Sequence, residues 1–203
     1  MQKLLIATTN KGKLQELKEF LHDLPVEIVS LSDVGITQDV AEDGKTYKEN
    51  AEKKAKFYSK LSGLPAVADD GGLEIDALGR KPGVYSRRWV GGEGKDGDIV
   101  TKMLQVAKEL PEDNRKARFG GVNAFALPTG EVWSEDGYVE GIIAEKPLMK
   151  LLEGFPYRSF LYLPQLKKYY HESELTPDEI RKYNHRYIAI QKLKPTIKRV
   201  LSI

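Results

Sequence analysis

The chain has 203 residues, a length that suits one large domain or two small lobes and excludes an array of domains. Hydrophobic residues make up 40% of it, charged residues 31%, and cysteine is absent, so disorder throughout, collagen-like repetition and thiolate or disulfide chemistry are excluded. Lys and Arg number 32 against 30 for Asp and Glu, and the formal net charge of +2 is too small to indicate a nucleic-acid binder.

The first sixty residues alternate between strand and helix patterns. The apolar run Leu4–Ala7 predicts a buried strand, and apolar residues at helical spacing after it predict a helix that begins near Gly12. A second strand is expected over 26–31. Thr46 and a glutamate three residues later have the spacing of a capping box, which predicts a helix over 47–62.

A third strand is expected over 65–69, where the chain runs into Asp69 and Asp70. Successive strand residues point to opposite faces of a sheet, so the two carboxylates can share a target only if the strand ends between them. The glycine pair Gly71-Gly72 directly after them predicts that the strand does end there.

The second half begins with a loop-rich stretch over 79–97, which holds six glycines and one proline. Thr176-Pro177-Asp178-Glu179 supplies an N-cap, a proline and an acid at a helix start. The last helix is expected to be disturbed at Pro195. The other expected elements are a helix through 99–110 and strands at 118–127, 131–139, 141–144 and 160–163. Together these patterns predict one α/β domain over residues 1–203, with room for two lobes around a cleft.

The loop Thr8-Thr9-Asn10-Lys11-Gly12-Lys13 joins the first expected strand to the first helix. Small polar residues and a glycine leave backbone N–H groups open there, and the helix dipole and Lys13 add positive potential. The loop therefore suits a phosphate. The alternative is an N-cap loop with surface lysines, since the segment matches neither the Walker A nor the G-x-G-x-x-G pattern.

Glu42, Asp69 and Asp70 are candidate metal ligands. A divalent ion carried by a nucleotide needs a few carboxylates plus phosphate oxygens rather than a complete protein cage. The alternative is that Asp69 and Asp70 are turn acids in an Asp-Asp-Gly loop, and the pair taken alone favours that interpretation.

The capped helix carries Lys54 on one stripe with Asn50, Phe57 and Tyr58. Lys53 lies about 100° away around the same helix. A surface lysine is the alternative for both, and it is the preferred interpretation for Lys53.

His185-Arg186 could hold a phosphate or the edge of a base, although a single histidine is more often structural. Phe155 and Tyr157 are expected to pack in the core, with base stacking as the alternative. Residues 158–203 hold ten Lys and Arg against four Asp and Glu. This basic part could face an anion such as phosphate or RNA, or form a solvated helix face.

Seven segments taken together resemble the non-canonical purine nucleoside triphosphate pyrophosphatases, the inosine triphosphatase family. The resemblance spans nearly the whole chain, and its first five segments are together quite specific. The segments are Ala7–Lys13, Glu42–Thr46, Asn50–Ala55, Ala68–Leu73, Pro82–Arg88, Gly154–Tyr157 and His185-Arg186.

The resemblance implies an α/β fold with a mixed central sheet, flanking helices and two lobes around an active-site cleft, usually assembled as a homodimer. It also implies Mg²⁺-dependent cleavage of a nucleoside triphosphate to the monophosphate and pyrophosphate. The implied role is removal of aberrant nucleotides such as ITP, dITP and XTP, with no nucleic-acid or membrane partner.

By the same resemblance, Glu42 and Asp70 bind the metal, and Asp70 also acts as the base toward the attacking water. Asp69 is implied to be an auxiliary acid, and Lys54 to hold the triphosphate. The implied substrate-binding residues are Thr8, Thr9, Asn10, Lys11, Gly12, Lys13, Gly71, Arg88, Phe155, Tyr157, Arg158, His185 and Arg186.

The departures from the family pattern bear on the substrate rather than on the metal. Gly71 and Asn184 stand where the family has serines, and Ser159 stands where it has a proline. Arg158 replaces an acid and Ile180 replaces a lysine. A site that pairs buried donors and acceptors with a base discriminates strongly, so base choice is expected to shift from inosine and xanthosine.

Two other functions stay open from the sequence. A non-catalytic nucleotide-binding or sensor protein would need the phosphate loop but no base, so Glu42 and Asp70 argue against it. An RNA- or partner-binding protein would use the basic C-terminal part. The apolar N-terminal run is too short for a signal peptide, and no stretch approaches the roughly 20 apolar residues of a membrane span. A cytoplasmic protein is therefore expected.

Overall fold

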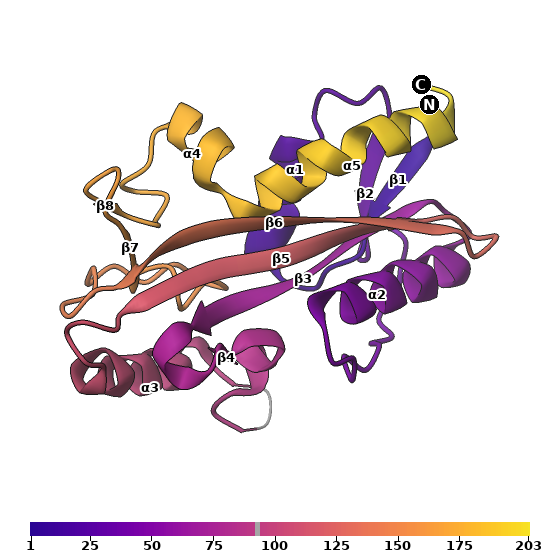
Figure 1. Cartoon of the computed structure of the whole chain (residues 1–203). Helices are drawn as coiled ribbons and strands as arrows, with labels where there is room; N and C mark the ends of the chain where they lie inside the picture. Colours follow the sequence, from indigo (N-terminus) through magenta and orange to yellow (C-terminus); the bar gives the residue numbers. More distant parts are fainter. Residues whose placement is uncertain (92–93) are drawn as a thin grey trace. The chain divides into compact units, whose positions relative to one another are not determined.

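The computed structural model describes residues 1–91 and 94–203 (Figure 1). Gly92 and Glu93, inside the loop-rich stretch expected over 79–97, lie outside the described residues. The elements are β1 (Lys3–Ile6), α1 (Lys11–Phe20), β2 (Glu27–Ser30), α2 (Tyr47–Ser62), β3 (Ala66–Ile75), η1 (Asp76–Leu78), β4 (Lys81–Pro82), η2 (Gly83–Arg88), α3 (Asp96–Glu109), β5 (Lys116–Ala126), β6 (Val132–Ile143), β7 (Leu161–Leu163), β8 (Lys168–Tyr169), α4 (Pro177–Tyr183) and α5 (His185–Leu201).

The strands form a mixed sheet in the order β2-β1-β3-β5-β6-β7-β8, with β4 paired to β3. β1 is parallel to β2 and to β3, whereas the pairs β6–β7 and β7–β8 are antiparallel. The expected α/β class with a mixed central sheet and flanking helices is therefore confirmed. None of the described helices is long and apolar enough to cross a membrane.

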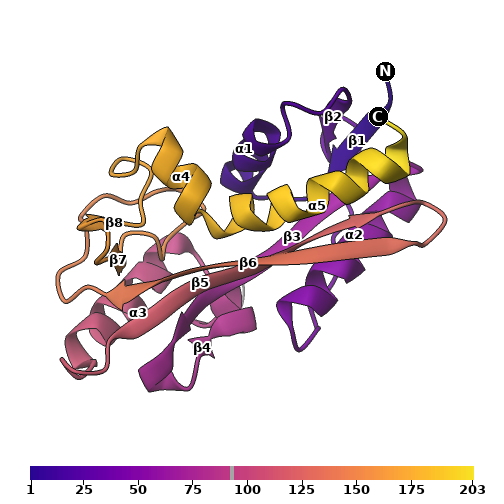
Figure 2. The ribbon, with the colours of Figure 1, turned by 45° about the horizontal axis from the view of Figure 1, so that its top comes forward.

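The chain divides into two compact units. The first unit comprises residues 1–70, 121–137 and 185–203, and the second comprises residues 71–120 and 138–184. In the first unit, α2 covers one face of the strands and α1 and α5 lie on the other (Figures 1 and 2). An edge-to-face contact between Phe20 and Tyr187 joins α1 to α5, with ring centres 5.0 Å apart.

Local sequence signals set the bounds of α2. Thr46 Oγ1 accepts a hydrogen bond from the backbone N–H of Glu49 at 3.1 Å, which caps the first turn. Ala51, Ala55 and Tyr58 recur at helical spacing and are buried against the strands. The predicted helix over 47–62 is confirmed, since α2 spans the same residues. Its N-terminal cap and its apolar stripe both favour a helix over this segment.

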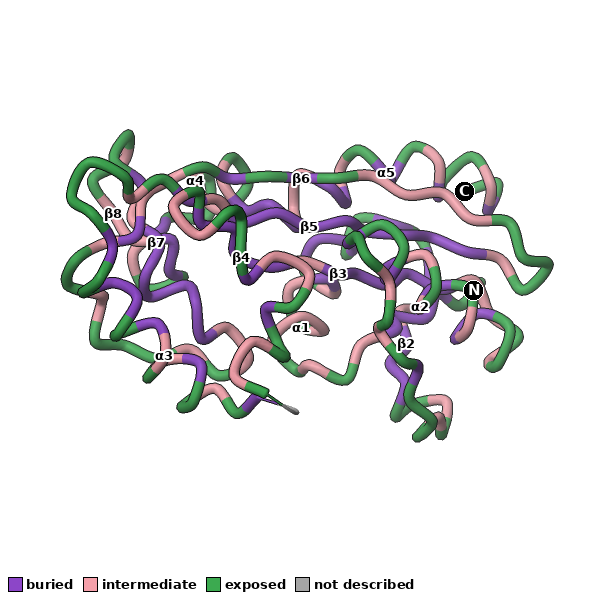
Figure 3. Tube along the Cα trace, turned by 60° about the horizontal axis from the view of Figure 1, so that its bottom comes forward, coloured by how far each residue is buried: buried purple, intermediate pink, exposed green. Residues whose placement is uncertain are grey.

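The second unit has its own apolar core. Ile99, Met103 and Val106 on α3 supply one side of it, and Phe160 and Leu161 from the segment entering β7 supply another. Buried positions follow β3 and β5 along their length, while the helices alternate between buried and exposed positions (Figure 3). The strands are therefore the buried layer, and the helices have one face in water.

The structure differs from the expectations about the second half in its strands. The segments expected as separate strands over 131–139 and 141–144 form the single strand β6, because the ladder with β7 continues through Ile142 and Ile143. α5 includes Pro195, where the expected helix is present and the proline removes one intrahelical hydrogen bond, and Leu193 and Ile197 are buried on both sides of it. The two-residue strands β4 and β8 were not expected, because they are too short to show a periodicity.

The expected end of β3 between Asp69 and Asp70 is also wrong, since the strand continues to Ile75. The glycine pair lies inside the strand, at a place where Ser86 of η2 packs directly against the backbone. A Cβ on Gly72 would stand 2.1 Å from Ser86 Oγ, so the position admits no side chain. The two aspartates are therefore successive residues of one strand and point to its opposite faces.

Candidate active site

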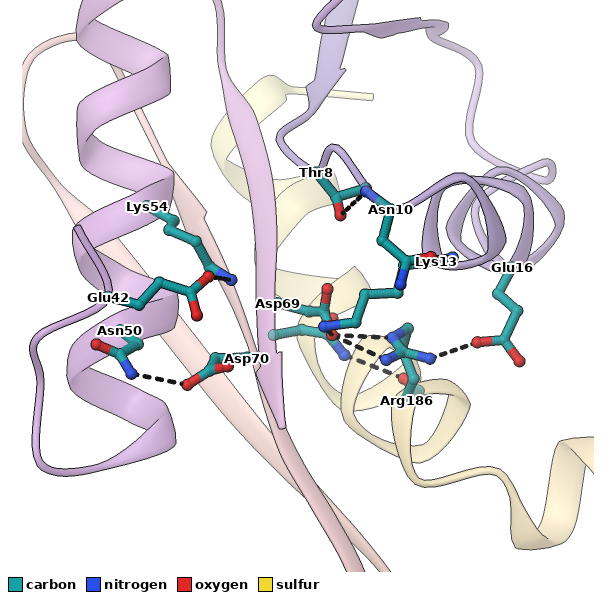
Figure 4. A network of polar contacts seen from close by, with 11 residues as sticks. Thr8, Asn10, Lys13, Glu16, Glu42, Asn50, Lys54, Asp69, Asp70 and Arg186 are labelled. Atoms are coloured by element: carbon teal, nitrogen blue, oxygen red, sulfur yellow. Dashed lines mark hydrogen bonds and ion pairs between the residues drawn. The ribbon is translucent and has the colours of Figure 1, made fainter. Parts of the chain in front are cut away.

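Two groups of polar side chains lie on opposite sides of β3 in the first unit (Figure 4). Asp70 faces α2, and Asp69 faces α1 and α5. Both residues are nearly fully buried, with exposed fractions of 6% and 3%. Buried carboxylates require charged or hydrogen-bonding partners, and these two have different ones.

On the α2 side, Asn50 Nδ2 donates to Asp70 Oδ2 at 3.0 Å. One turn later in the helix, Lys54 Nζ donates to Glu42 Oε1 at 2.7 Å, and the Lys54 side chain is only 12% exposed. Lys53 points elsewhere and pairs with an exposed aspartate of the preceding loop. The predicted separation of the two lysines onto different faces of the helix is present.

The charges on this side change the acidity of Asp70. Burial raises the pKa of Asp70, Lys54 opposes this effect, Glu42 adds to it, and the result is a pKa of about 6. Burial alone would lower the pKa of Lys54, but Asp70 and Glu42 outweigh it and the pKa is raised. Lys54 is therefore a permanent cation, beside a carboxylate that can take up or release a proton near neutral pH.

On the other side, Asp69 belongs to a buried salt-bridge cluster. Asp69 Oδ2 accepts from Arg186 Nε at 3.0 Å and from Nη2 at 2.9 Å, and Lys13 Nζ lies 3.3 Å from the same oxygen. Arg186 Nη1 donates to Glu16 on α1. Burial would raise the pKa of Asp69, but Arg186 and Lys13 outweigh it and hold that pKa well below its usual range. Asp69 is therefore a permanent anion, and the guanidinium implied to enclose a base is engaged by two acids.

The loop before α1 has the form of an anion-binding turn. Asn10 caps the helix, because its Oδ1 accepts the backbone N–H of Lys13 at 3.0 Å. The backbone N–H of Asn10 donates in turn to Thr8 Oγ1 at 3.2 Å. The positive end of the helix dipole and the Lys13 ammonium lie at this turn, which suits a phosphate. The exposed or half-buried residues of the loop are Thr8, Thr9, Asn10, Lys11, Gly12 and Lys13.

Glu42 and Asp70 are the carboxylates that could hold a metal. They come from a loop and a strand, and the repulsion between them contributes to the raised pKa of Asp70. Across residues 1–91 and 94–203, no group of three or more His, Cys, Asp or Glu side chains could form a metal site. Two carboxylates fit Mg²⁺, because this ion keeps several waters and binds mainly through the phosphates of a nucleotide.

The residues implied to bind the base are mostly in the second unit. Arg158 is 4% exposed, and its guanidinium carbon lies 3.8 Å from the ring centre of Phe155 and 5.2 Å from that of Tyr170. Tyr157 is part of the apolar core, and its hydroxyl donates to the backbone oxygen of Ser86 at 2.6 Å. Phe155 and Arg158 therefore form a cation–π pair, whereas Tyr157 shows the expected core packing.

The other predicted site residues differ in their exposure to solvent. Arg88 is exposed at the end of η2, with its guanidinium carbon 5.6 Å from the ring centre of Tyr85. Ile180 packs on the core of the second unit, and His185 is buried at the start of α5. The second unit holds Gly71, Arg88, Phe155, Tyr157 and Arg158, and the first unit holds all the other predicted site residues.

Two residues of these networks, Asn50 and Glu16, were not predicted as site residues. Asn50 shares the stripe of Lys54, and this signal could have found it. Glu16 gives no such signal, because its partner Arg186 lies 170 positions further along the chain.

Comparisons with known proteins assign the chain to a family. The Ham1 family model matches residues 4–196. The chain is 38% identical over 207 residues to the dITP/XTP pyrophosphatase of Clostridium perfringens, covering 99% of this chain and 100% of the relative. It is 40% identical over 191 residues to the dITP/XTP pyrophosphatase of Thermus thermophilus, covering 94% and 89%. A solved HAM1 protein from Coxiella burnetii matches with a TM-score of 0.82 and 32% identity, covering 98% and 100%. The chain therefore belongs to the Ham1 family.

Proposed function

We propose that this protein hydrolyses nucleoside triphosphates to the nucleoside monophosphate and pyrophosphate, with hypoxanthine and xanthine nucleotides among its substrates. The observation that carries the proposal is Asp70, a buried carboxylate with a pKa of about 6 that contacts Asn50 and is flanked by Lys54 and Glu42. The relatives named dITP/XTP pyrophosphatase support the same reaction.

In the proposed reaction, a water molecule attacks the α-phosphorus and pyrophosphate leaves. Asp70 accepts the proton of that water on Oδ1, the oxygen that the Asn50 hydrogen bond does not use. Lys54 and Lys13 neutralise the charge that builds on the pyrophosphate as it leaves. Mg²⁺ held by Glu42 and Asp70 would act as a Lewis acid toward the phosphate oxygens.

Several finer assignments belong to the same proposal. The chain acts as one catalytic domain over residues 1–203, and Phe155 and Arg158 are among the residues that bind the base. The cofactor is Mg²⁺, and the enzyme works in the cytoplasm as a homodimer. Resemblance to the inosine triphosphatases supports each of these assignments, and the two carboxylates Glu42 and Asp70 support the metal.

The purified protein is expected to release pyrophosphate, and not orthophosphate, from dITP in the presence of Mg²⁺. Attack at the α-phosphorus leaves the β- and γ-phosphates joined, so orthophosphate should form only when inorganic pyrophosphatase is added. The measurement is phosphate release with and without pyrophosphatase across a panel of nucleotides, with an EDTA control. Orthophosphate and a nucleoside diphosphate appearing without pyrophosphatase would contradict the proposal, and a total lack of turnover would favour a nucleotide-binding protein.

Lys54→Ala is expected to lower kcat/KM for the triphosphate at least about tenfold, because a charge-assisted hydrogen bond contributes at least about 1.5 kcal/mol. Lys53→Ala is the matched control, since its exposed ion pair contributes less than about 1 kcal/mol and faces away from Asp70. Steady-state kinetics of both variants check the prediction. Equal effects of the two substitutions would show that the assignment of helix faces to function is wrong.

A further inference from the structure

Asn50 is a fully buried polar residue that joins the two candidate metal-binding segments. Its Nδ2 donates to Asp70 Oδ2 at 3.0 Å, and its Oδ1 accepts the backbone N–H of Gly44 at 2.8 Å. Gly44 lies two residues after Glu42, in the loop that precedes α2. One side chain with an exposed fraction of 0% thus holds the strand with one carboxylate and the loop with the other.

These two partners fix the orientation of the Asn50 carboxamide. Rotating the amide by 180° would place its oxygen against the Asp70 carboxylate and its NH₂ group against the N–H of Gly44. Both contacts would then be repulsive, and buried groups would be left unpaired at a cost of about 1–3 kcal/mol each. Asp70 therefore meets a donor at Oδ2 in one defined geometry, and Oδ1 is left for other chemistry.

The next turn of α2 reinforces the same arrangement. Lys54 holds Glu42 through the 2.7 Å bond to Oε1, so consecutive turns of one helix fix both carboxylates. Gly44 is needed for the close approach, because a Cβ there would lie 2.6 Å from Asn50 Oδ1. The Gly44 backbone is not in the left-handed region, so a substitution there acts by displacing Asn50 rather than by backbone strain.

We propose that Asn50 is a positioning residue, whose carboxamide aligns Asp70 and the Glu42 loop for a divalent cation and for the attacking water. This inference rests on the proposed function and extends it to a residue that neither holds the metal nor touches the substrate. Removing a side chain that orients a metal-binding carboxylate typically lowers metal affinity or activity about 10- to 100-fold.

The test compares Asn50→Ala and Gly44→Ala with Ser59→Ala as the matched control. Ser59 is an equally buried polar residue of α2, and its hydroxyl donates to the backbone oxygens of Leu64 and Ala126. Each variant is assayed for Mn²⁺ binding by isothermal titration calorimetry, for kcat and KM with dITP, and for thermal unfolding. Gly44→Ala retains the Asn50 side chain, so it tests the alignment even if Asn50→Ala folds poorly.

The expected result is a 10- to 100-fold loss in Mn²⁺ affinity and in kcat for Asn50→Ala, and about a tenfold loss for Gly44→Ala, with KM changed less than threefold. Ser59→Ala should lose thermal stability while keeping Mn²⁺ affinity and kcat within about twofold. Asn50→Ala with parental Mn²⁺ affinity and kcat would overturn the inference, and so would equal losses in Ser59→Ala. If the parent protein hydrolyses no triphosphate, the proposed function fails, and the Mn²⁺ isotherms still decide the role of Asn50.

Discussion

Asp70→Asn is expected to keep the fold and to lose about 10²–10⁴-fold in kcat, because it removes the general base and a metal ligand together. An amide at this position still accepts the hydrogen bond from Asn50, so the buried packing is retained. Steady-state kinetics with dITP and Mg²⁺ check the loss. Full turnover in Asp70→Asn together with an inactive Asp69→Asn would reverse the assignment of the two acids.

The same pair of substitutions should have opposite effects on the thermal stability of the metal-free protein. The pKa of Asp70 is raised to about 6 in the folded chain, so its ionisation destabilises the fold as the pH rises from about 4 through 6. The pKa of Asp69 is lowered by Arg186 and Lys13, so its charge stabilises the fold at neutral pH, and this contribution is lost as the pH falls through its folded-state pKa. In EDTA at pH 7.5, Asp70→Asn should therefore raise Tm and Asp69→Asn should lower it.

The opposite effects on Tm assign different roles to the two adjacent residues, catalysis to Asp70 and stability to Asp69. Asp70 carries an unfavourable charge that the proposed chemistry uses, and Asp69 carries a favourable charge that fixes Lys13 and Arg186. Active sites commonly hold groups that reduce stability, and their substitution then stabilises the fold while activity is lost. A lower Tm in Asp70→Asn than in Asp69→Asn would contradict this division.

The sequence predicted the elements that local interactions determine. The start of α2 follows from Thr46 and that of α4 from Thr176, whose capping box is complete, because cap and helix lie within a few residues of each other. The length of β3 could not be predicted in this way. The glycine pair is typical of a strand end, but here the close approach of Ser86, fourteen positions after Gly72, leaves no room for a side chain inside a strand that continues to pair with β4.

The site shows the same division between local and distant determinants. The stripe of α2 placed Lys54 apart from Lys53, and the motifs pointed to Glu42 and Asp70. The sequence could not predict the partners of Asp69 and Asp70. The two side chains point to opposite faces only because β3 continues past them. The pairing of Asp69 with Arg186 joins residues 117 positions apart, a distance over which helical and strand periodicities carry no information.

Arg158 is the residue with the largest expected effect on base choice. It is buried, and its guanidinium carbon lies 3.8 Å from the ring centre of Phe155, the other residue of the second unit that is proposed to bind the base. Arginine offers only donors, whereas the acid expected there by resemblance would accept the ring N–H of a 6-keto purine. Leaving that donor unpaired costs about 1–3 kcal/mol, or roughly 5- to 150-fold in catalytic efficiency.

We therefore expect this enzyme to prefer inosine-type bases less strongly than its family does, and to favour bases that present acceptors to Arg158. Arg158→Ala should change the ranking of bases, because the acceptors then lose their partner, and Arg181→Ala, an exposed arginine of the same unit, should leave the ranking unchanged. The measurement is kcat/KM for inosine, xanthosine, guanosine, adenosine and pyrimidine triphosphates, in ribo and deoxy forms. Thermal unfolding of each variant separates a change in specificity from a loss of folded protein. A strong preference for inosine and xanthosine triphosphates that persists unchanged in Arg158→Ala would show that other groups read the base.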